Sequence, residues 1–180
     1  MIYQLSFNRY KFLVADIPLE EIYEKHGTYY PFQDEHEQEL ESWQAIWKPL
    51  NIRFYNDSDS NITAIPDITC WFTDQLIMND KAFKHLKEPL KQYGEWLPTL
   101  CENIPYWLFH VNLKTDLSYV DNNKSQRNID ETGFIEVTKL GFLKNKVESL
   151  LIFKSQFNNY ENIYCNQTFK DLSKTTNLKA

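Results

Sequence analysis

Glycine is scarce in this sequence of 180 residues, which contains only four glycines, at positions 27, 94, 133 and 141. A phosphate-binding loop needs several closely spaced glycines, because only these let backbone N–H groups approach the phosphate. The isolated glycines therefore exclude the common nucleotide-binding motifs. The sequence also lacks the G-x-S-x-G pattern that places a hydrolase serine on a sharp turn.

Cysteine is almost as rare, with three residues far apart at Cys70, Cys101 and Cys165. An odd number without close pairs matches neither a disulfide framework nor a zinc or redox motif. We expect the three thiols to serve as small apolar side chains. Cys101 and His110 are the nearest candidates for a nucleophile and its base, and we expect their proximity in sequence to be coincidental.

Long apolar runs are also missing. Nowhere do about 18 apolar residues follow one another, as a membrane span requires. The first ten residues show no basic region followed by an apolar core and a cleavage site. We therefore expect a soluble cytoplasmic protein that has no membrane association.

Positive charge is scarce toward the N-terminus. Residues 1–70 hold 5 Lys and Arg against 12 Asp and Glu, whereas residues 71–180 hold 14 against 13, and the net charge is −6. An acidic surface repels the phosphate backbone, so nucleic acid is not an expected partner. The acidity of the N-terminal region is more typical of a protein that attracts a basic partner.

Three stretches show helical spacing of apolar residues. The pattern predicts a helix from Leu19 to His26 that ends before Gly27, with Asp16 as its N-cap, and a helix over 34–47 that ends before Pro49. A third helix begins after Asn79 or Asp80, with Ala82, Phe83, Leu86 and Leu90 as its apolar face.

The remaining apolar stretches are short and favour strands. Residues 2–7 and 10–15 are predicted to form a hairpin around a turn at Asn8-Arg9. Further strands are expected over 67–73, 96–101, 106–113, 134–139, 150–153 and 162–165, followed by a short helix from Asn166. Strands outnumber helices without regular alternation, which predicts a single α+β domain over residues 1–180 with a mainly antiparallel sheet and a few short helices.

The most acidic stretch combines carboxylates with one histidine, His36. Neighbouring residues on a helix point in different directions, so these side chains are not expected to converge on a metal ion. One interpretation is a solvated helix face. The other is a partner-binding surface, with Trp43 and Trp47 either in the core or as anchors. On the second interpretation the candidate contacts are the five acidic residues Asp34, Glu35, Glu37, Glu39 and Glu41.

Several blocks in the middle and C-terminal regions resemble a known family. In chain order they are Pro66-Asp67-Ile68, residues 76–82, Glu95-Trp96-Leu97-Pro98, residues 106–111, Leu117 with Asp121 and Ser125, residues 135–137, residues 151–153 and residues 163–165. Their order is similar to that of the Imm11-like immunity proteins of bacterial polymorphic toxin systems. The similarity covers about residues 66–172, and the acidic residues 1–65 match loosely. The family's Gly-rich closing segment is replaced here by Asn177-Leu178-Lys179-Ala180.

The resemblance implies a non-enzymatic protein that binds and neutralises a cognate toxin. It carries no catalytic, metal or cofactor residue over to this chain, and no such residue or cofactor is expected. Two alternatives remain open. One is an enzyme whose site assembles from dispersed residues such as His110, Asp116 and Asp121. The other is an oligomeric adaptor or structural protein, since the sequence leaves the oligomeric state open.

Overall fold

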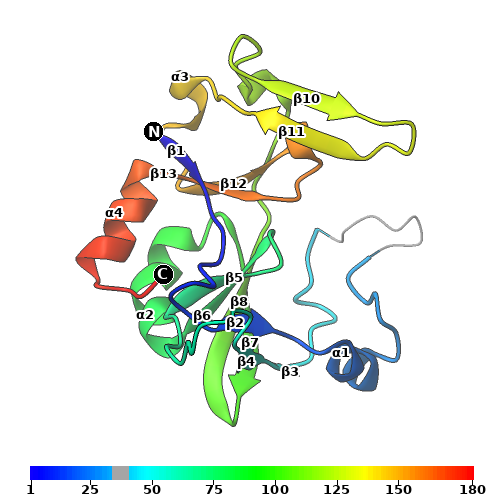
Figure 1. Ribbon diagram of the computed structural model, residues 1–180, viewed down its shortest axis with the longest axis vertical. Helices are drawn as coiled ribbons and strands as arrows, with labels where there is room; N and C mark the ends of the chain where they lie inside the picture. Colours follow the sequence, from blue (N-terminus) through cyan, green and yellow to red (C-terminus); the bar gives the residue numbers. More distant parts are fainter. Residues whose placement is uncertain (34–40) are drawn as a thin grey trace.

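A computed structural model describes residues 1–33 and 41–180, and its arrangement confirms the predicted single α+β domain. A five-stranded sheet in the order β3-β7-β8-β6-β5 forms the centre (Figure 1). Only β3 runs parallel to its neighbour, so the sheet is mainly antiparallel. Its strands are β3 (Leu50–Asn51), β5 (Ile68–Trp71), β6 (Gln75–Asn79), β7 (Gly94–Cys101) and β8 (Ile104–Val111).

Three smaller sheets surround the central one. In the order β1-β13-β12-β9, four strands form the largest of them, and β10–β11 and β2–β4 are two-stranded. In Figure 1 the β10–β11 hairpin lies at the end of the molecule opposite to α1. The strands are β1 (Ile2–Gln4), β2 (Val14–Asp16), β4 (Arg53–Tyr55), β9 (Lys114–Thr115), β10 (Gln126–Ile129), β11 (Ile135–Lys139), β12 (Ile152–Ser155) and β13 (Ile163–Asn166).

The helices are short. Those of the described residues are α1 (Leu19–His26), α2 (Asp80–Leu90), α3 (Lys144–Val147) and α4 (Gln167–Thr175), with 3-10 helices η1 (Leu117–Tyr119) and η2 (Gln156–Asn158). None of them has the length and apolar character needed to cross a membrane. The longest, α2, has 11 residues, whereas a span needs about 20.

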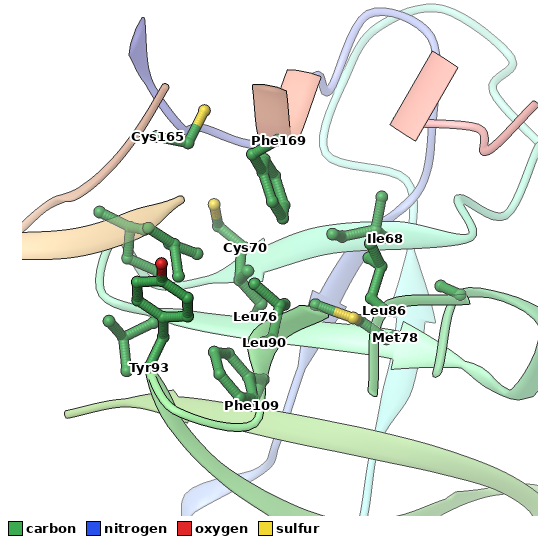
Figure 2. Close-up of a cluster of buried hydrophobic side chains, with 14 residues drawn as sticks. Ile68, Cys70, Leu76, Met78, Leu86, Leu90, Tyr93, Phe109, Cys165 and Phe169 are labelled. Atoms are coloured by element: carbon green, nitrogen blue, oxygen red, sulfur yellow. The ribbon is translucent and has the colours of Figure 1, made fainter. Parts of the chain in front are cut away.

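Alternation along the central strands gives the sheet two apolar faces. On β6, Leu76 and Met78 join a cluster beneath α2 and α4, while Ile77 joins a cluster on the opposite face. Figure 2 shows the first cluster, in which Phe169 of α4 and Leu86 of α2 approach the strands. The second cluster contains Ile22 of α1, Phe32 and Trp43. The sheet is therefore covered on both sides.

Two of the predicted helices agree closely with the structure. Residues 19–26 form α1, which ends at Gly27 with a φ of +77°, a conformation that glycine adopts easily. Its N-cap is Pro18 rather than Asp16. Asn79 caps α2 by accepting a hydrogen bond from the Ala82 N–H, and the helix continues through Pro89 in its last turn.

The predicted N-terminal hairpin is wrong. Strand β1 pairs with β13, and β2 pairs with β4, so the two strands belong to different sheets. The strand positions are partly correct, but the pairing partners lie more than 35 residues away in sequence. The pairings of β1 with β13 and of β3 with β7 also place N-terminal strands in the same sheets as later segments of the chain.

The helix predicted over 34–47 is absent from the described part of that range, residues 41–47. Residues 34–40 lie outside the described residues, and 41–47 form an irregular segment with a turn at 44–46. The carboxylate of Glu95 accepts hydrogen bonds from the backbone N–H groups of Trp43 and Gln44. The indole N–H of Trp47 donates to the carbonyl of Pro98 at 2.8 Å. Tertiary contacts of this kind override the helical spacing of the tryptophans.

Candidate functional site

A cavity of about 730 Å³ opens on the α1 side of the central sheet. We call it the aromatic cavity, because seven aromatic residues account for much of its lining: Tyr29, Tyr30, Phe32, Trp43, Trp71, Phe72 and Tyr160. They come from the segment after α1, from the β5–β6 turn and from the loop after η2. Its volume is within the range of pockets that bind small molecules or inserted side chains.

The mouth of the cavity exposes large aromatic surfaces to solvent. Tyr30 is 70% exposed, Phe72 63% and Tyr29 47%. Deeper in the wall, Trp43 and Trp71 are buried, and Phe32 stacks on Trp43 with 4.2 Å between ring centroids. Single exposed apolar residues are ordinary on a protein surface, but several around one cavity are typical of a binding site.

Two of these aromatic residues have a backbone conformation that large side chains rarely adopt. Phe72 has a φ of +51° and Tyr160 a φ of +63°, and Asn159 beside Tyr160 has a φ of +53°. A bulky residue in this left-handed region costs about 1 kcal/mol or more. Phe72 lies in the tight turn between Trp71 and Gln75, and Tyr160 lies just beyond η2. Glycine would be preferred for folding alone at either position.

Polar side chains form a hydrogen-bonded chain beneath the cavity. The Nζ of Lys154 lies 3.1 Å from Oδ2 of Asp74, and the same oxygen accepts a bond from the Gln75 amide at 3.0 Å. The Oε1 of Gln75 then lies 3.1 Å from Nδ1 of His110. Lys154, Gln75 and His110 are all buried, whereas Asp74 lines the cavity. We call these four residues the polar chain.

The geometry of the polar chain assigns the proton on His110. The amide nitrogen of Gln75 donates to Asp74, so the amide oxygen of Gln75 faces His110. An amide oxygen can only accept a hydrogen bond. The Nδ1 atom of His110 therefore carries the hydrogen. The same ring stacks on Trp43 with a centroid distance of 4.1 Å, so the chain connects β12 with the wall of the cavity.

Two buried indoles in the wall lack a hydrogen-bond partner. The Nε1 atoms of Trp43 and Trp71 have no acceptor among the residues that the structure describes. A buried donor without an acceptor costs about 1–3 kcal/mol. Next to them, burial and the charge of Lys48 lower the pKa of His26, whose ring packs against the edge of Phe32. This wall is built less favourably for stability than an ordinary core.

The charges around the cavity are mixed. Asp74 and Glu161 line it together with Lys114, whose Nζ lies 5.3 Å from the centre of the Tyr160 ring. Among the described residues, no group of three or more His, Cys, Asp or Glu could hold a metal ion. Aromatic walls with a few polar groups are suited to recognition of a partner.

The predicted partner-binding residues lie mostly outside the described residues: Asp34, Glu35, Glu37 and Glu39. Glu41 is described and exposed, two positions before Trp43 in the cavity wall. Gln33, on the other side of that stretch, also lines the cavity. The acidic stretch is thus bounded in sequence by residues of the aromatic cavity.

The residues suggested for a dispersed catalytic site have separate structural roles. His110 belongs to the polar chain. Asp116 caps η1, and its hydrogen bonds with Ser118 lower its pKa. Asp121 forms an ion pair with Lys124 that lowers its pKa.

The expected coincidence of Cys101 and His110 is also confirmed. Cys101 pairs with Ile104 at one end of the β7–β8 hairpin, whereas His110 pairs with Glu95. Six residues along a strand correspond to roughly 20 Å. The thiol and the imidazole are therefore too far apart to act as nucleophile and base.

Comparisons with known proteins add no relative to this picture. No protein family model matches the chain, and no curated protein sequence matches it.

Proposed function

We propose that this protein is a non-enzymatic immunity protein that binds and neutralises a bacterial toxin in the cytoplasm of the producing cell. We further propose that the aromatic cavity is its toxin-binding face. The observation that carries this proposal is the pair Phe72 and Tyr160, two large aromatic residues in left-handed backbone at one cavity. Residues that fold at a cost and remain accessible are typical of functional sites.

The side chains at the mouth suit a protein partner. Tyrosine and tryptophan dominate the binding energy of protein interfaces, since they bury a large area with few rotatable bonds. Tyr29, Tyr30 and Phe72 offer such area because their side chains are already exposed. The resemblance of residues 66–172 to immunity proteins supports the same class of partner.

The negative charge of the N-terminal region supports a basic toxin as the partner. Residues 1–70 carry a net charge of −7, and the acidic residues 34, 35, 37, 39 and 41 fall between two residues of the cavity lining. Complementary charge accelerates encounter between proteins and matters less for final affinity. We therefore propose that these acids steer the toxin and that the aromatic residues hold it.

The test uses the product of the neighbouring open reading frame as the candidate toxin. Co-expression should rescue cells from the toxin, and the two proteins should elute together in gel filtration. Phe72→Gly should weaken the complex roughly 30-fold, the effect of losing about 2 kcal/mol at an interface. The variant should not lose stability, because glycine relieves the left-handed backbone at this position.

Phe134 provides a matched control, since it is 61% exposed and lies away from the cavity lining. Phe134→Ala should leave toxin binding unchanged. A toxin that stays active and forms no complex would refute the immunity function. A complex that forms equally well with Phe72→Gly would instead refute the role of the aromatic cavity.

A further inference from the structure

A second hollow lies on the opposite face of the central sheet, beneath α4. Its volume is about 390 Å³, and its walls come mainly from residues 3–8 with Phe12, the start of β5, α4, and Leu178 with Ala180. We call it the α4 groove. The α4 groove and the aromatic cavity share no described lining residue. The groove is therefore a separate feature from the proposed toxin-binding face.

The floor of the α4 groove is apolar. Ile68, Cys70, Leu76, Cys165 and Phe169 line it, and all five belong to the cluster beneath α2 and α4. Figure 2 shows Cys70 and Phe169 on the side of this cluster that faces Cys165. Burial raises the pKa of both Cys70 and Cys165 to about 12, so these thiols are neutral at physiological pH. They act as apolar wall rather than as reactive groups.

Two lysines of α4 lie at the mouth of the groove. Lys170 and Lys174 are four residues apart, a spacing that places both on one face of the helix. Like charges at this spacing destabilise a helix by a few tenths of a kcal/mol. Neither lysine is in an ion pair with another described residue, and Asp171 between them accepts a bond from Gln167 instead. The Nζ of Lys170 lies 3.8 Å from the centre of the Tyr3 ring.

We propose that the α4 groove binds a free medium-chain fatty acid, with the alkyl chain on the apolar floor and the carboxylate between Lys170 and Lys174. An apolar floor together with two lysines that form no ion pair with a described residue matches a ligand that has one apolar end and one anionic end. The volume is near the lower limit of small-molecule pockets, which favours a single chain over a two-chain lipid. Bound carboxylate would also relieve the repulsion between the lysines.

Binding is measured with decanoate, by displacement of dansyl-labelled undecanoic acid from the full chain. Decanoate should compete, and decanol, which has the same chain without the charge, should compete at least roughly tenfold less well. Replacing both lysines, as Lys170→Gln with Lys174→Gln, should weaken decanoate by about tenfold and leave decanol unchanged, as expected for loss of a charge-assisted contact. The control replaces Lys84 and Lys87 of α2 by Gln and should change neither ligand.

A second variant tests where the alkyl chain of the ligand binds. Ser173 lines the groove, and Ser173→Phe should fill it and weaken decanoate and decanol alike. Circular dichroism shows whether each variant keeps its fold. Failure of decanoate to bind, equal competition by decanol, or binding only to vesicles of phosphatidylglycerol would each overturn the proposal. Because no toxin is present in these measurements, their outcome is independent of the proposed immunity function.

Discussion

The two faces of the central sheet are covered in different ways. On one face, the regular helices α2 and α4 pack on an apolar cluster that includes Leu86, Leu90 and Phe169. On the other face, irregular segments around α1 bring Trp43 and Phe32 against the sheet, and the polar chain lies among them. The helical face carries the features that stabilise a domain. The face with the aromatic cavity carries the aromatic residues in left-handed backbone, whereas buried indoles without a described acceptor occur on both faces, at Trp96 on the helical face and at Trp43 and Trp71 on the other.

Hydrogen bonds from side chains take the place of helices on the cavity face. Glu95 accepts from Ser42 and from the Trp43 backbone, and Glu21 accepts from the backbone and side chain of Asn51. Such contacts hold irregular backbone in one conformation and still leave room for a cavity. Both faces bury apolar clusters, and the cavity face gives up part of the resulting stability to aromatic residues in left-handed backbone.

The largest loss of stability is expected from a substitution on the helical face, the side of the sheet covered by α2 and α4. Leu86 of α2 is fully buried, and Leu86→Ala should lower the free energy of unfolding by about 3–4 kcal/mol, because it removes apolar contacts and leaves a cavity. Urea unfolding followed by circular dichroism measures the change. Lys84→Ala on the exposed side of α2 is the control and should cost no more than about 0.5 kcal/mol. Similar losses in both variants would contradict the assignment of this face as the main source of stability.

The next largest loss of stability is expected from a substitution in the polar chain. Lys154 is completely buried and paired with Asp74, whose side chain is 29% exposed. Lys154→Met should destabilise the protein by about 2–3 kcal/mol, somewhat less than a fully buried pair because solvent reaches Asp74. The double variant with Asp74→Asn should recover some of the loss, since it removes the carboxylate left without lysine. A loss in urea unfolding below about 0.5 kcal/mol would show that the polar chain does not support the cavity.

Asp67 should give a smaller and pH-dependent effect. Burial alone would raise its pKa, but hydrogen bonds from the Lys179 backbone, Asn79 and Lys81 outweigh burial and lower it. A lowered pKa in the folded state stabilises the protein above the unfolded pKa of about 3.9, and this stabilisation is lost as the pH falls through the folded value. Asp67→Asn should therefore cost about 1–2 kcal/mol at neutral pH.

The pH dependence separates this role of Asp67 from simple loss of packing. The difference in unfolding free energy between the native protein and Asp67→Asn should persist at pH 5 and shrink below about pH 4. A difference that stays constant down to the acid range would mean that the carboxylate charge is not involved. Asp59→Asn, in an exposed loop, is the control and should show little change at any pH.

The helical face could be predicted from sequence because its signals are local. The signals are Asn79 before Asp80, the apolar spacing from Ala82 to Leu90, and the apolar stretches of β7 and β8, and each lies within a window of about ten residues. The fold class follows from these elements. The missed strand β6 begins only a few residues beyond β5, so the apolar pattern does not separate the two strands.

The cavity face could not be predicted in the same way, because its contacts join distant residues. Trp43 and Trp47 have helical spacing, yet Glu95 and Pro98 determine their positions from about 50 residues away. Nothing near Phe72 in the sequence marks a positive φ. Lys154 does carry a signal, since it is the one charged residue of the otherwise uncharged strand β12, but its partner Asp74 lies 80 residues earlier. The acids 34–39 lie outside the described residues, so their role stays a prediction.

The smallest change in unfolding free energy is expected from glycine substitutions at residues with positive φ. Comparing two such sites separates backbone strain at the proposed binding face from backbone strain in an ordinary turn. Glu102 and Asn103 form the two-residue turn between β7 and β8 with φ values of +50° and +67°, where glycine is preferred at the second position. Asn103→Gly should raise the free energy of unfolding by about 0.5 kcal/mol and leave toxin binding unchanged. Phe72→Gly should give a similar or slightly larger gain and weaken binding. If urea unfolding showed that Phe72→Gly costs more than about 1 kcal/mol, Phe72 would belong to the stabilising core, and the contrast between the two faces would no longer hold.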